Sequence, residues 1–174
     1  MSERGELAPN VRAYLNMIVD MQGSPPATSD LVYSLAELVR SFGLPMVKGH
    51  LPEGVEIGTP KFCYQNAAEL VLAKPDRFVY CEGYAMGVIP VPHAWAVDLR
   101  TGLVVDPTWA AIGGVGEEYL GIPFQAEFLR VSLLNREVYG ILENWEEGFP
   151  LLKAPLAHEP EKWLFSDRLN CLQD

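Results

Sequence analysis

The stretch "RFVYCEGYAMGVIPVPHAWAVDLRTGLVVDPTW" (residues 77–109) holds three extended runs separated by turn-forming residues. The runs "RFVYCEGYA", "HAWAVDL" and "LVVDPTW" are rich in β-branched and aromatic residues, which favour strands. Only "RTG" separates the last two runs, so they predict a hairpin. We therefore expect this stretch to form an antiparallel β-meander.

The segments before the meander have apolar residues at helical spacing. Apolar residues recur at this spacing in residues 10–22 and again in residues 31–42, with "GSPPATS" between the two segments. A third helix is expected to start near Thr59, because a threonine hydroxyl can cap free backbone N–H groups and Pro60 is tolerated in a first turn. The Lys74-Pro75 pair should end it.

The remaining segments give weaker patterns. Residues 46–58 are expected to be irregular, with at most one short strand, and residues 117–134 show a mixed pattern. A helix is expected over Val138, Ile141, Leu142 and Trp145. Several prolines follow Gly148, so we expect the C-terminal tail to wrap the surface or to be partly mobile. These patterns predict a single α+β domain spanning residues 1–174.

Composition excludes several classes of protein. The chain has 174 residues, 49% of them hydrophobic and 21% charged, as expected for a globular domain. No apolar run approaches the roughly 18 residues needed to span a bilayer, and "MSERGELAPN" lacks the layout of a signal peptide. We expect a cytoplasmic protein with no membrane partner. The net charge of −10, with no basic patch in the sequence, argues against nucleic acid as a partner.

The cysteines and histidines do not predict a metal or a disulfide framework. Three cysteines are an odd number, and we expect a reducing compartment. The three histidines and three cysteines contain no close ligand pair of the kind that zinc sites use. The loop "GGVG" lacks the lysine and the Ser or Thr of a phosphate-binding loop. The sequence therefore predicts no metal and no cofactor.

Cys63 lies at the predicted start of the third helix. In a first turn, free N–H groups and the positive end of the helix dipole favour a thiolate over a thiol, as a cysteine nucleophile requires. The same position also suits an inert core cysteine, since Cys63 would head the apolar face formed by Ala67, Leu70 and Val71. Cys63 alone therefore leaves both interpretations open.

His93 and Asp106 lie at opposite ends of the predicted hairpin. A two-residue turn at Arg100-Thr101 would pair Trp95 with Asp106 and leave Asp106 one diagonal step from His93 on the same face. Cys63, His93 and Asp106 would then supply a nucleophile, a base and a group that orients the base. A register shifted by one residue would separate His93 from Asp106, so spacing alone leaves the triad and a coincidence equally open.

Four further residues are candidates for substrate binding. Trp95, on the same face as His93, would either wall the site or anchor the core. Glu82 would be a substrate-side acid or, in the interpretation that we favour, a solvent-facing residue of an alternating strand. Tyr64 and Gln65 follow the nucleophile directly, although Gln65 and Asn66 more readily point away or cap neighbouring elements.

The same residues resemble the core of the transglutaminase-like cysteine enzymes. That pattern has a cysteine opening a helix, an arginine-containing strand ending in Gly-Tyr, a His-x-Trp strand and a strand closing on Val-Asp-Pro-Thr. The matching pieces occur here in the same order over about 50 residues: Cys63, Arg77, Gly83-Tyr84, His93-Ala94-Trp95 and Val105-Asp106-Pro107-Thr108-Trp109. The chain departs from the pattern around the cysteine, where Lys61-Phe62 and Tyr64 flank it.

The resemblance implies a papain-like α+β fold, in which a helix bearing the nucleophile packs on an antiparallel meander and N-terminal helices are added. Its catalytic core would cover about residues 59–109. It carries over Cys63 as nucleophile, His93 as general base and acid, and Asp106 as the residue that orients the imidazole. The expected activity is that of a cysteine-dependent amide hydrolase or acyltransferase, such as a protease, amidase, deamidase or transglutaminase, that forms a thioester on a protein or peptide-like amide.

Two alternatives remain at this stage. A non-catalytic binding module could retain the fold, although such modules commonly lack a member of the triad. An arylamine acetyltransferase would show an Arg-Gly-Gly run before the cysteine, where this chain has "GTPKFC". The size is compatible with a bacterial or phage protein. The sequence gives no indication of the oligomeric state.

Overall fold

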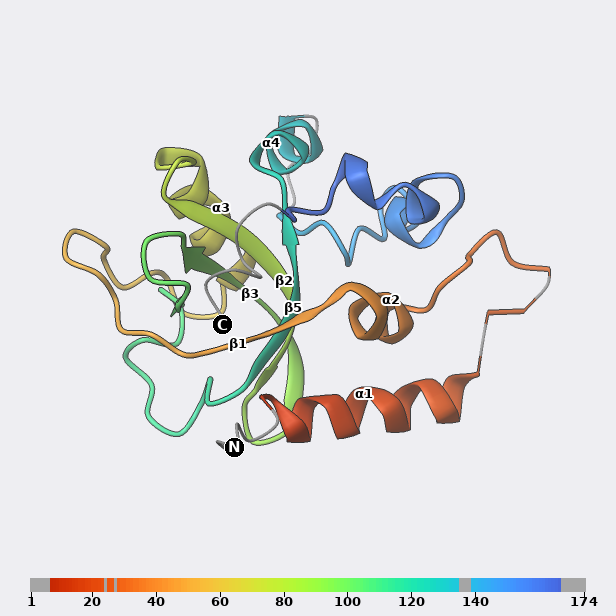
Figure 1. Ribbon diagram of the computed structural model, residues 1–174, viewed down its shortest axis with the longest axis horizontal. Coiled ribbons are helices and arrows are strands. Elements are labelled where there is room, and N and C mark those ends of the chain that lie inside the picture. The colour runs from red at the N-terminus through yellow and green to blue at the C-terminus, as the bar shows by residue number, and fades with distance from the viewer. Residues whose placement is uncertain (1–6, 24, 27, 135–138, 167–174) are drawn as a thin grey trace, which may run out of the picture.

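The computed structural model describes residues 7–23, 25, 26, 28–134 and 139–166, and shows an α+β arrangement (Figure 1). The α-helices are α1 (Pro9–Gln22), α2 (Leu35–Phe42), α3 (Cys63–Ala73) and α4 (Ala126–Leu134). The strands are β1 (Leu44–Met46), β2 (Phe78–Met86), β3 (Pro90–Asp98), β4 (Val104–Val105) and β5 (Tyr119–Phe124). Three short 3-10 helices follow: η1 (Pro150–Leu152), η2 (Leu156–His158) and η3 (Pro160–Lys162).

The strands form one antiparallel sheet in the order β1-β5-β2-β3-β4. The meander β2-β3-β4 confirms the prediction for residues 77–109. On its other side, β2 pairs with β5, and β5 pairs with β1. The sequence analysis did not predict β5, because "YLGIPF" contains a glycine and a proline that interrupt a strand pattern.

The hairpin between β3 and β4 has the predicted register. Ala96 pairs with Val105 and Val97 with Val104. Extended by one residue, the same register places Trp95 opposite Asp106. The turn is wider than the predicted two residues, because Asp98 N–H donates to the carbonyl of Leu103 and closes the hairpin there. The wider turn keeps the same pairing of residues between the two strands, so His93 and Asp106 remain on the same face.

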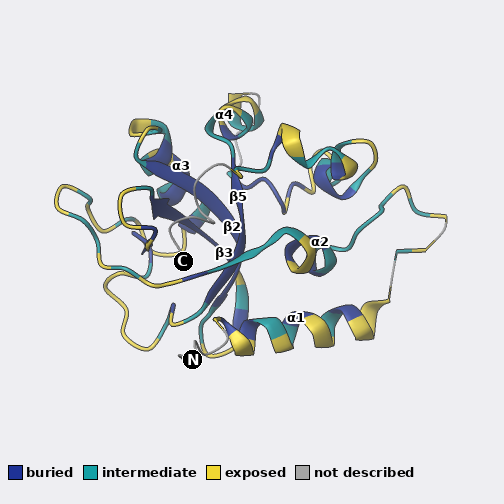
Figure 2. Ribbon diagram, in the orientation of Figure 1, coloured by how far each residue is buried: buried dark blue, intermediate teal, exposed yellow. Residues whose placement is uncertain are grey.

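Side chains of β2 and β3 are buried on both faces of the sheet (Figure 2). On one face, Ala94 and Ala96 belong to a core cluster with Ala67 and Val71 of α3. The small alanines let helix α3 lie close to the sheet, and this packing fixes the position of its N-terminus. On the opposite face, Trp95 belongs to a second core cluster.

Helix α3 starts later than predicted. Its N-cap is Phe62, with no side-chain cap, and Cys63 is its first residue, so the predicted capping by Thr59 is wrong. Lys61 adopts a positive φ of 71°, which interrupts the chain between Thr59 and the helix. The Asn66 side chain instead holds Thr59, donating to its carbonyl at 2.8 Å and accepting from its N–H at 3.1 Å. The predicted end at Lys74 is confirmed.

The N-terminal helices largely confirm their predictions. Helix α1 begins at Pro9, one residue before the predicted start. Helix α2 begins at Leu35 rather than Leu31, because Ser34 and Glu37 form a capping box there. Leu31 instead forms an isolated bridge with Lys153.

The C-terminal part of the chain differs most from the sequence prediction. Residues 139–148 contain no helix, so the helix expected over Ile141, Leu142 and Trp145 is wrong, and Val138 lies outside the described residues. Helix α4 instead occupies the segment with a mixed pattern. Between Gly148 and residue 166 the tail is not a surface wrap, since Leu151 and Trp163 are almost fully buried in the main core cluster. Among the described helices, none has both the length and the apolar character needed to cross a bilayer.

Candidate functional site

His93 and Asp106 form a buried hydrogen-bonded pair. Strand β3 carries His93, and Asp106 follows β4 directly. His93 Nε2 lies 2.7 Å from Asp106 Oδ2, and only 2% of His93 and 7% of Asp106 are exposed. The contact joins the two residues that the predicted register places on one face. The charge of the carboxylate is therefore available to orient the imidazole and to stabilise its protonated form.

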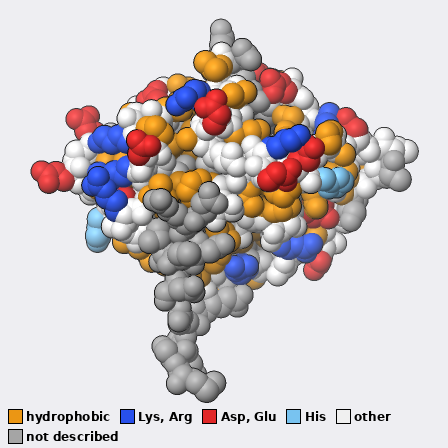
Figure 3. Space-filling view, turned by 45° about the horizontal axis from the view of Figure 1, so that its top comes forward, with side chains coloured by type: hydrophobic (Ala, Val, Ile, Leu, Met, Phe, Trp, Pro, Cys, Tyr) orange, Lys and Arg blue, Asp and Glu red, His pale blue; other side chains and the backbone are white. Residues whose placement is uncertain are grey.

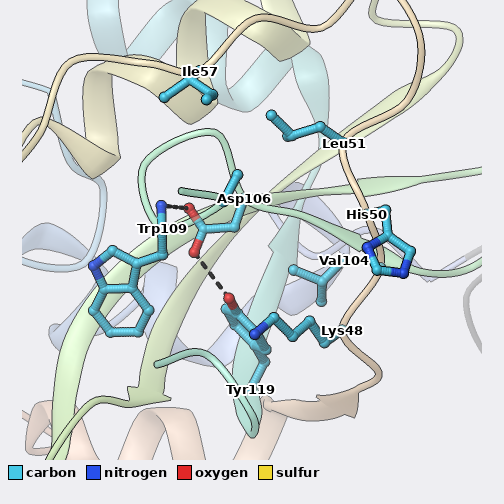
Figure 4. Close-up of a pocket in the computed structure, with 10 residues that line it drawn as sticks. Lys48, His50, Leu51, Ile57, Val104, Asp106, Trp109 and Tyr119 are labelled. Carbon is cyan, nitrogen blue, oxygen red and sulfur yellow. Dashed lines mark hydrogen bonds between the residues drawn. The ribbon is translucent and has the colours of Figure 1, made fainter. Parts of the chain in front are cut away.

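Three further donors fix the Asp106 carboxylate. Oδ1 accepts from the backbone N–H groups of Thr108 at 2.9 Å and Trp109 at 3.1 Å, so the chain turns tightly around the carboxylate. Oδ2 also accepts from the Tyr119 hydroxyl on β5 at 2.9 Å (Figure 4). These donors satisfy the lone pairs that face away from His93 and hold the carboxylate in one orientation.

Trp109 covers the imidazole. The two rings stack with centroids 3.9 Å apart and an interplanar angle of 17°. Trp95, two residues further along β3 on the same face, has its ring centroid 6.3 Å from that of His93 and an interplanar angle of 22°. The histidine ring is thus held by aromatic contacts as well as by Asp106, which limits its rotation.

Cys63 lies at the N-terminus of α3 and is 9% exposed. Its side chain interacts with the imidazole of His93. Because Asp106 occupies Nε2, the nitrogen left for Cys63 is Nδ1. The backbone N–H groups of a first helical turn have no intrahelical acceptor, so they present partial positive charge at the thiol.

Hydrogen bonds join the start of α3 to the loop that carries Asp106. Asn66 Nδ2 donates to Thr108 Oγ1 at 2.9 Å, and Gly58 N–H donates to the carbonyl of Pro107 at 2.9 Å. Strand β4 pairs with β3 at Ala96 and Val97, so the pairing between these two strands ends before it reaches His93. Asn66 therefore positions the helix against the triad loop, which fits the predicted capping of a neighbouring element.

The pKa of His93 reflects its two partners. Burial alone would lower this pKa, because it penalises the charged form. The interactions of His93 with Asp106 and Cys63 outweigh burial and raise the pKa of His93 to about 9. At neutral pH the imidazole is therefore protonated, which is the state that forms an ion pair with a thiolate.

Glu82 is buried, so the favoured prediction of a solvent-facing residue is wrong. Only 1% of Glu82 is exposed, and it points to the side of the sheet that α3 covers. Its carboxylate accepts from the Tyr80 hydroxyl at 2.7 Å and from the backbone N–H groups of Ile141 and Leu142. Burial raises the pKa of Glu82 to about 7, while these donors oppose the increase. Glu82 therefore offers almost no surface to a substrate.

The other candidates for substrate binding divide into core and surface residues. Trp95 is fully buried and donates from Nε1 to Met46 Sδ at 3.1 Å, so it anchors the core rather than walling the site. Tyr64 is half-buried, and its hydroxyl lies 3.4 Å from Glu143 Oε2. Gln65 donates to Glu69 at 2.7 Å along the surface of α3. Of these, Tyr64 is the one whose side chain borders the crevice beside the triad.

A cavity of about 170 Å³ opens beside Asp106 (Figure 4). Asp106, Trp109 and Tyr119 form its inner part, and Lys48 and His50 lie on its other side. Lys48 is engaged there by Glu117 at 2.8 Å and by the carbonyl of Val115. The cavity therefore reaches the carboxylate that orients the imidazole.

The surface charges do not mark the position of the site. Although the chain is strongly acidic, acidic and basic side chains are interspersed on the face shown in Figure 3.

Among the described residues, no group of three or more His, Cys, Asp or Glu side chains could hold a metal ion. Cys81 is fully buried, as predicted, and burial raises the pKa of its thiol. Cys171 lies outside the described residues.

The sequence analysis missed three residues that complete this arrangement: Tyr119, Trp109 and Asn66 in its contact with Thr108. Tyr119 lies on the unpredicted strand β5, so its approach to Asp106 depends on strand order, which the sequence pattern does not reveal. Trp109 closes the "VDPTW" motif, and an aromatic residue beside a predicted triad member is a signal that could have identified it.

Comparison with known proteins identifies no relative. No family model matches the chain, and neither the curated proteins nor the solved structures contain a match.

Proposed function

We propose that this protein is a cysteine-dependent amide hydrolase or acyltransferase with a papain-like, transglutaminase-like core. Cys63 would be the nucleophile, His93 the general base and acid, and Asp106 the residue that orients the imidazole. The observation that carries the proposal is the imidazole of His93, which contacts Asp106 at 2.7 Å and interacts with a cysteine at a helix N-terminus. This combination supplies an activated thiolate, its proton carrier and the group that orients the carrier.

In the proposed reaction, the Cys63 thiolate attacks the carbonyl carbon of an amide. The carbon–sulfur bond forms, the carbonyl becomes a tetrahedral oxyanion, and the protonated His93 gives its proton to the leaving amine. The carbon–nitrogen bond then breaks and leaves a thioester on Cys63. His93, now neutral, takes a proton from water or an acceptor amine, which attacks the thioester and regenerates the thiolate.

The start of α3 suits the developing negative charge. The backbone N–H of Cys63 lies in the first turn, where free N–H groups point out of the helix. It would donate to the oxyanion, and the helix dipole would add to this stabilisation. Removing one such donor from enzymes of this kind costs about 10²-fold to 10³-fold in rate. Stabilising the oxyanion would therefore be a substantial part of the catalysis.

A protein or peptide-like amide is the proposed substrate class, and a cytoplasmic location is proposed with it. A thioester mechanism converts a stable amide into a more reactive acyl-enzyme, so it suits amides more than small esters. Neither nucleic acid nor a membrane is part of the proposal, given the net charge of −10 and the interspersed surface charges.

Trapping the acyl-enzyme tests the proposal. With p-nitrophenyl acetate as donor, we expect a burst of nitrophenolate equal to the enzyme concentration and an acetyl group that mass spectrometry maps to Cys63. Cys63→Ala should abolish the burst, and His93→Gln should slow it by about 10²-fold or more. Acetylation spread over surface lysines, with no dependence on Cys63, would instead favour a non-catalytic module that retains the fold.

A further inference from the structure

Glu82 makes an unusual set of contacts beside the proposed nucleophile. Its carboxylate is buried under α3 and is not part of the triad. Two consecutive backbone N–H groups, those of Ile141 and Leu142, donate to its two oxygens, with a distance of 2.8 Å from Leu142 N to Oε2. Fifty-nine residues separate Glu82 from Ile141 in the chain. One carboxylate thus ties a distant, non-helical segment to the centre of the sheet.

The tied segment reaches the surroundings of Cys63. Gly140 lies against the ring of Tyr64, the residue that follows the nucleophile. Glu143 accepts from the Tyr64 hydroxyl at 3.4 Å. Cys63 also interacts with Tyr64 and Tyr80, so the thiol lies near this group of residues.

A narrow crevice lies between the segment and residues next to Cys63 and His93, and no triad residue lines it. Tyr64 and Pro92, the sequence neighbours of Cys63 and His93, line it together with Leu142 and Glu143. Glu82 and Gly83 form part of the same lining. Residues 140–143 have no helix or strand of their own to hold them, so their position beside the crevice depends on contacts such as those to Glu82.

We propose that Glu82 is a positioning residue that fixes residues 140–143 as a substrate-binding wall beside Cys63. This inference rests on the proposed function, since a wall requires a substrate at Cys63. Glu82 does not touch the reacting atoms. It acts through the backbone of Ile141 and Leu142, which sets where the side chains of Leu142 and Glu143 stand.

Hydrogen exchange measured amide by amide tests the first half of the proposal. Glu82→Ala removes both acceptors, and we expect the amides of Ile141 and Leu142 to exchange about tenfold faster or more, relative to amides of β2. Glu82→Gln keeps one acceptor oxygen and should expose only one of the two amides. Glu127→Gln, on the surface of α4, is the matched control and should change neither. Unchanged exchange at both amides in Glu82→Ala would overturn the proposal.

Alkylation with two reagents tests the second half. Iodoacetamide is small, whereas iodoacetanilide carries a phenyl group that would meet the wall. Glu82→Ala should change the ratio of the two rates at Cys63 by about threefold or more and leave the iodoacetamide rate within about twofold. Faster exchange at Ile141 and Leu142 with an unchanged ratio would mean that the segment is held but forms no wall, which also overturns the proposal.

These readouts separate the two proposals. If iodoacetamide labels Cys63 at a rate that does not depend on His93, the proposed function fails whatever the exchange data show. Should neither Glu82 variant fold, the wild-type protein decides the matter. Slow exchange of the Ile141 and Leu142 amides, comparable to that of β2, supports the role of Glu82, and exchange as fast as in an unstructured peptide overturns it.

Discussion

Asp106 and Glu82 are buried carboxylates with parallel sets of hydrogen bonds. Each accepts from two consecutive backbone N–H groups, Asp106 from Thr108 and Trp109 and Glu82 from Ile141 and Leu142. Each also accepts from a tyrosine hydroxyl, that of Tyr119 or Tyr80. The difference is a fourth partner, because Asp106 also contacts the imidazole of His93.

That one partner separates a chemical role from a structural one. The carboxylate of Asp106 helps to raise the pKa of His93 to about 9, so the pair is charged at neutral pH. Glu82 faces only neutral donors, and burial raises its pKa to about 7. A carboxylate with a cation beside it can tune a proton transfer, whereas one with neutral donors holds the backbone.

Replacing each carboxylate by its amide gives the largest expected difference. At pH 7.5, Asp106→Asn removes the counter-charge that keeps the buried imidazole protonated and should lower the free energy of unfolding by about 3 kcal/mol. Glu82→Gln loses hydrogen bonds but also removes a carboxylate whose ionisation burial disfavours, so the change should stay within about 1 kcal/mol. Urea denaturation measures both values. Equal losses in the two variants would contradict the distinction.

The pH dependence of stability should isolate Glu82. Its folded pKa of about 7 lies above the ordinary value of 4.5, so between these values the folded state binds more protons than the unfolded state. The contribution of Glu82 is therefore fully present below pH 4.5 and is lost as the pH rises through 7, a loss of about 3 kcal/mol.

Urea denaturation of the wild type and of Glu82→Gln at pH 5, 6 and 8 measures this loss. The difference between the two free energies of unfolding should shift in favour of the variant as the pH rises. A difference that is constant over this range would show that Glu82 has the same pKa in both states.

The two tyrosines give the smallest expected effect. Tyr119→Phe and Tyr80→Phe each remove one donor to a carboxylate and should each cost about 1 kcal/mol in urea denaturation. Only Tyr119→Phe should also slow the alkylation of Cys63, by about threefold, because it loosens the group that orients His93. A slower reaction in Tyr80→Phe alone would reverse the roles assigned to Asp106 and Glu82.

Local patterns in the sequence predicted the hairpin and the contact between His93 and Asp106. Strand alternation and a short turn determine which residues share a face, so the register could be derived from residues 93–106 alone. The wider turn between Asp98 and Leu103 did not change the result, because it keeps the same pairing. The triad hypothesis depended on this register.

The rest of the site depends on contacts between distant parts of the chain. Thr59 was predicted to cap α3, but Lys61 interrupts the helix and Asn66 binds the Thr59 backbone instead. Glu82 was expected to face solvent, and its partners Ile141 and Leu142 were expected in a helix. Alternation along a strand shows which residues share a face, but not whether another segment covers that face.

The central claim is that His93 and Asp106 activate Cys63. Alkylation of the native protein by iodoacetamide across pH, mapped to each cysteine by mass spectrometry, tests it most directly in the wild type and in His93→Gln. We expect Cys63 of the wild type to react at pH 6 about 10²-fold faster than in His93→Gln, because an unassisted thiol is less than about 1% ionised at that pH. A Cys63 that reacts equally slowly in both proteins, or only once the protein unfolds, would contradict the account.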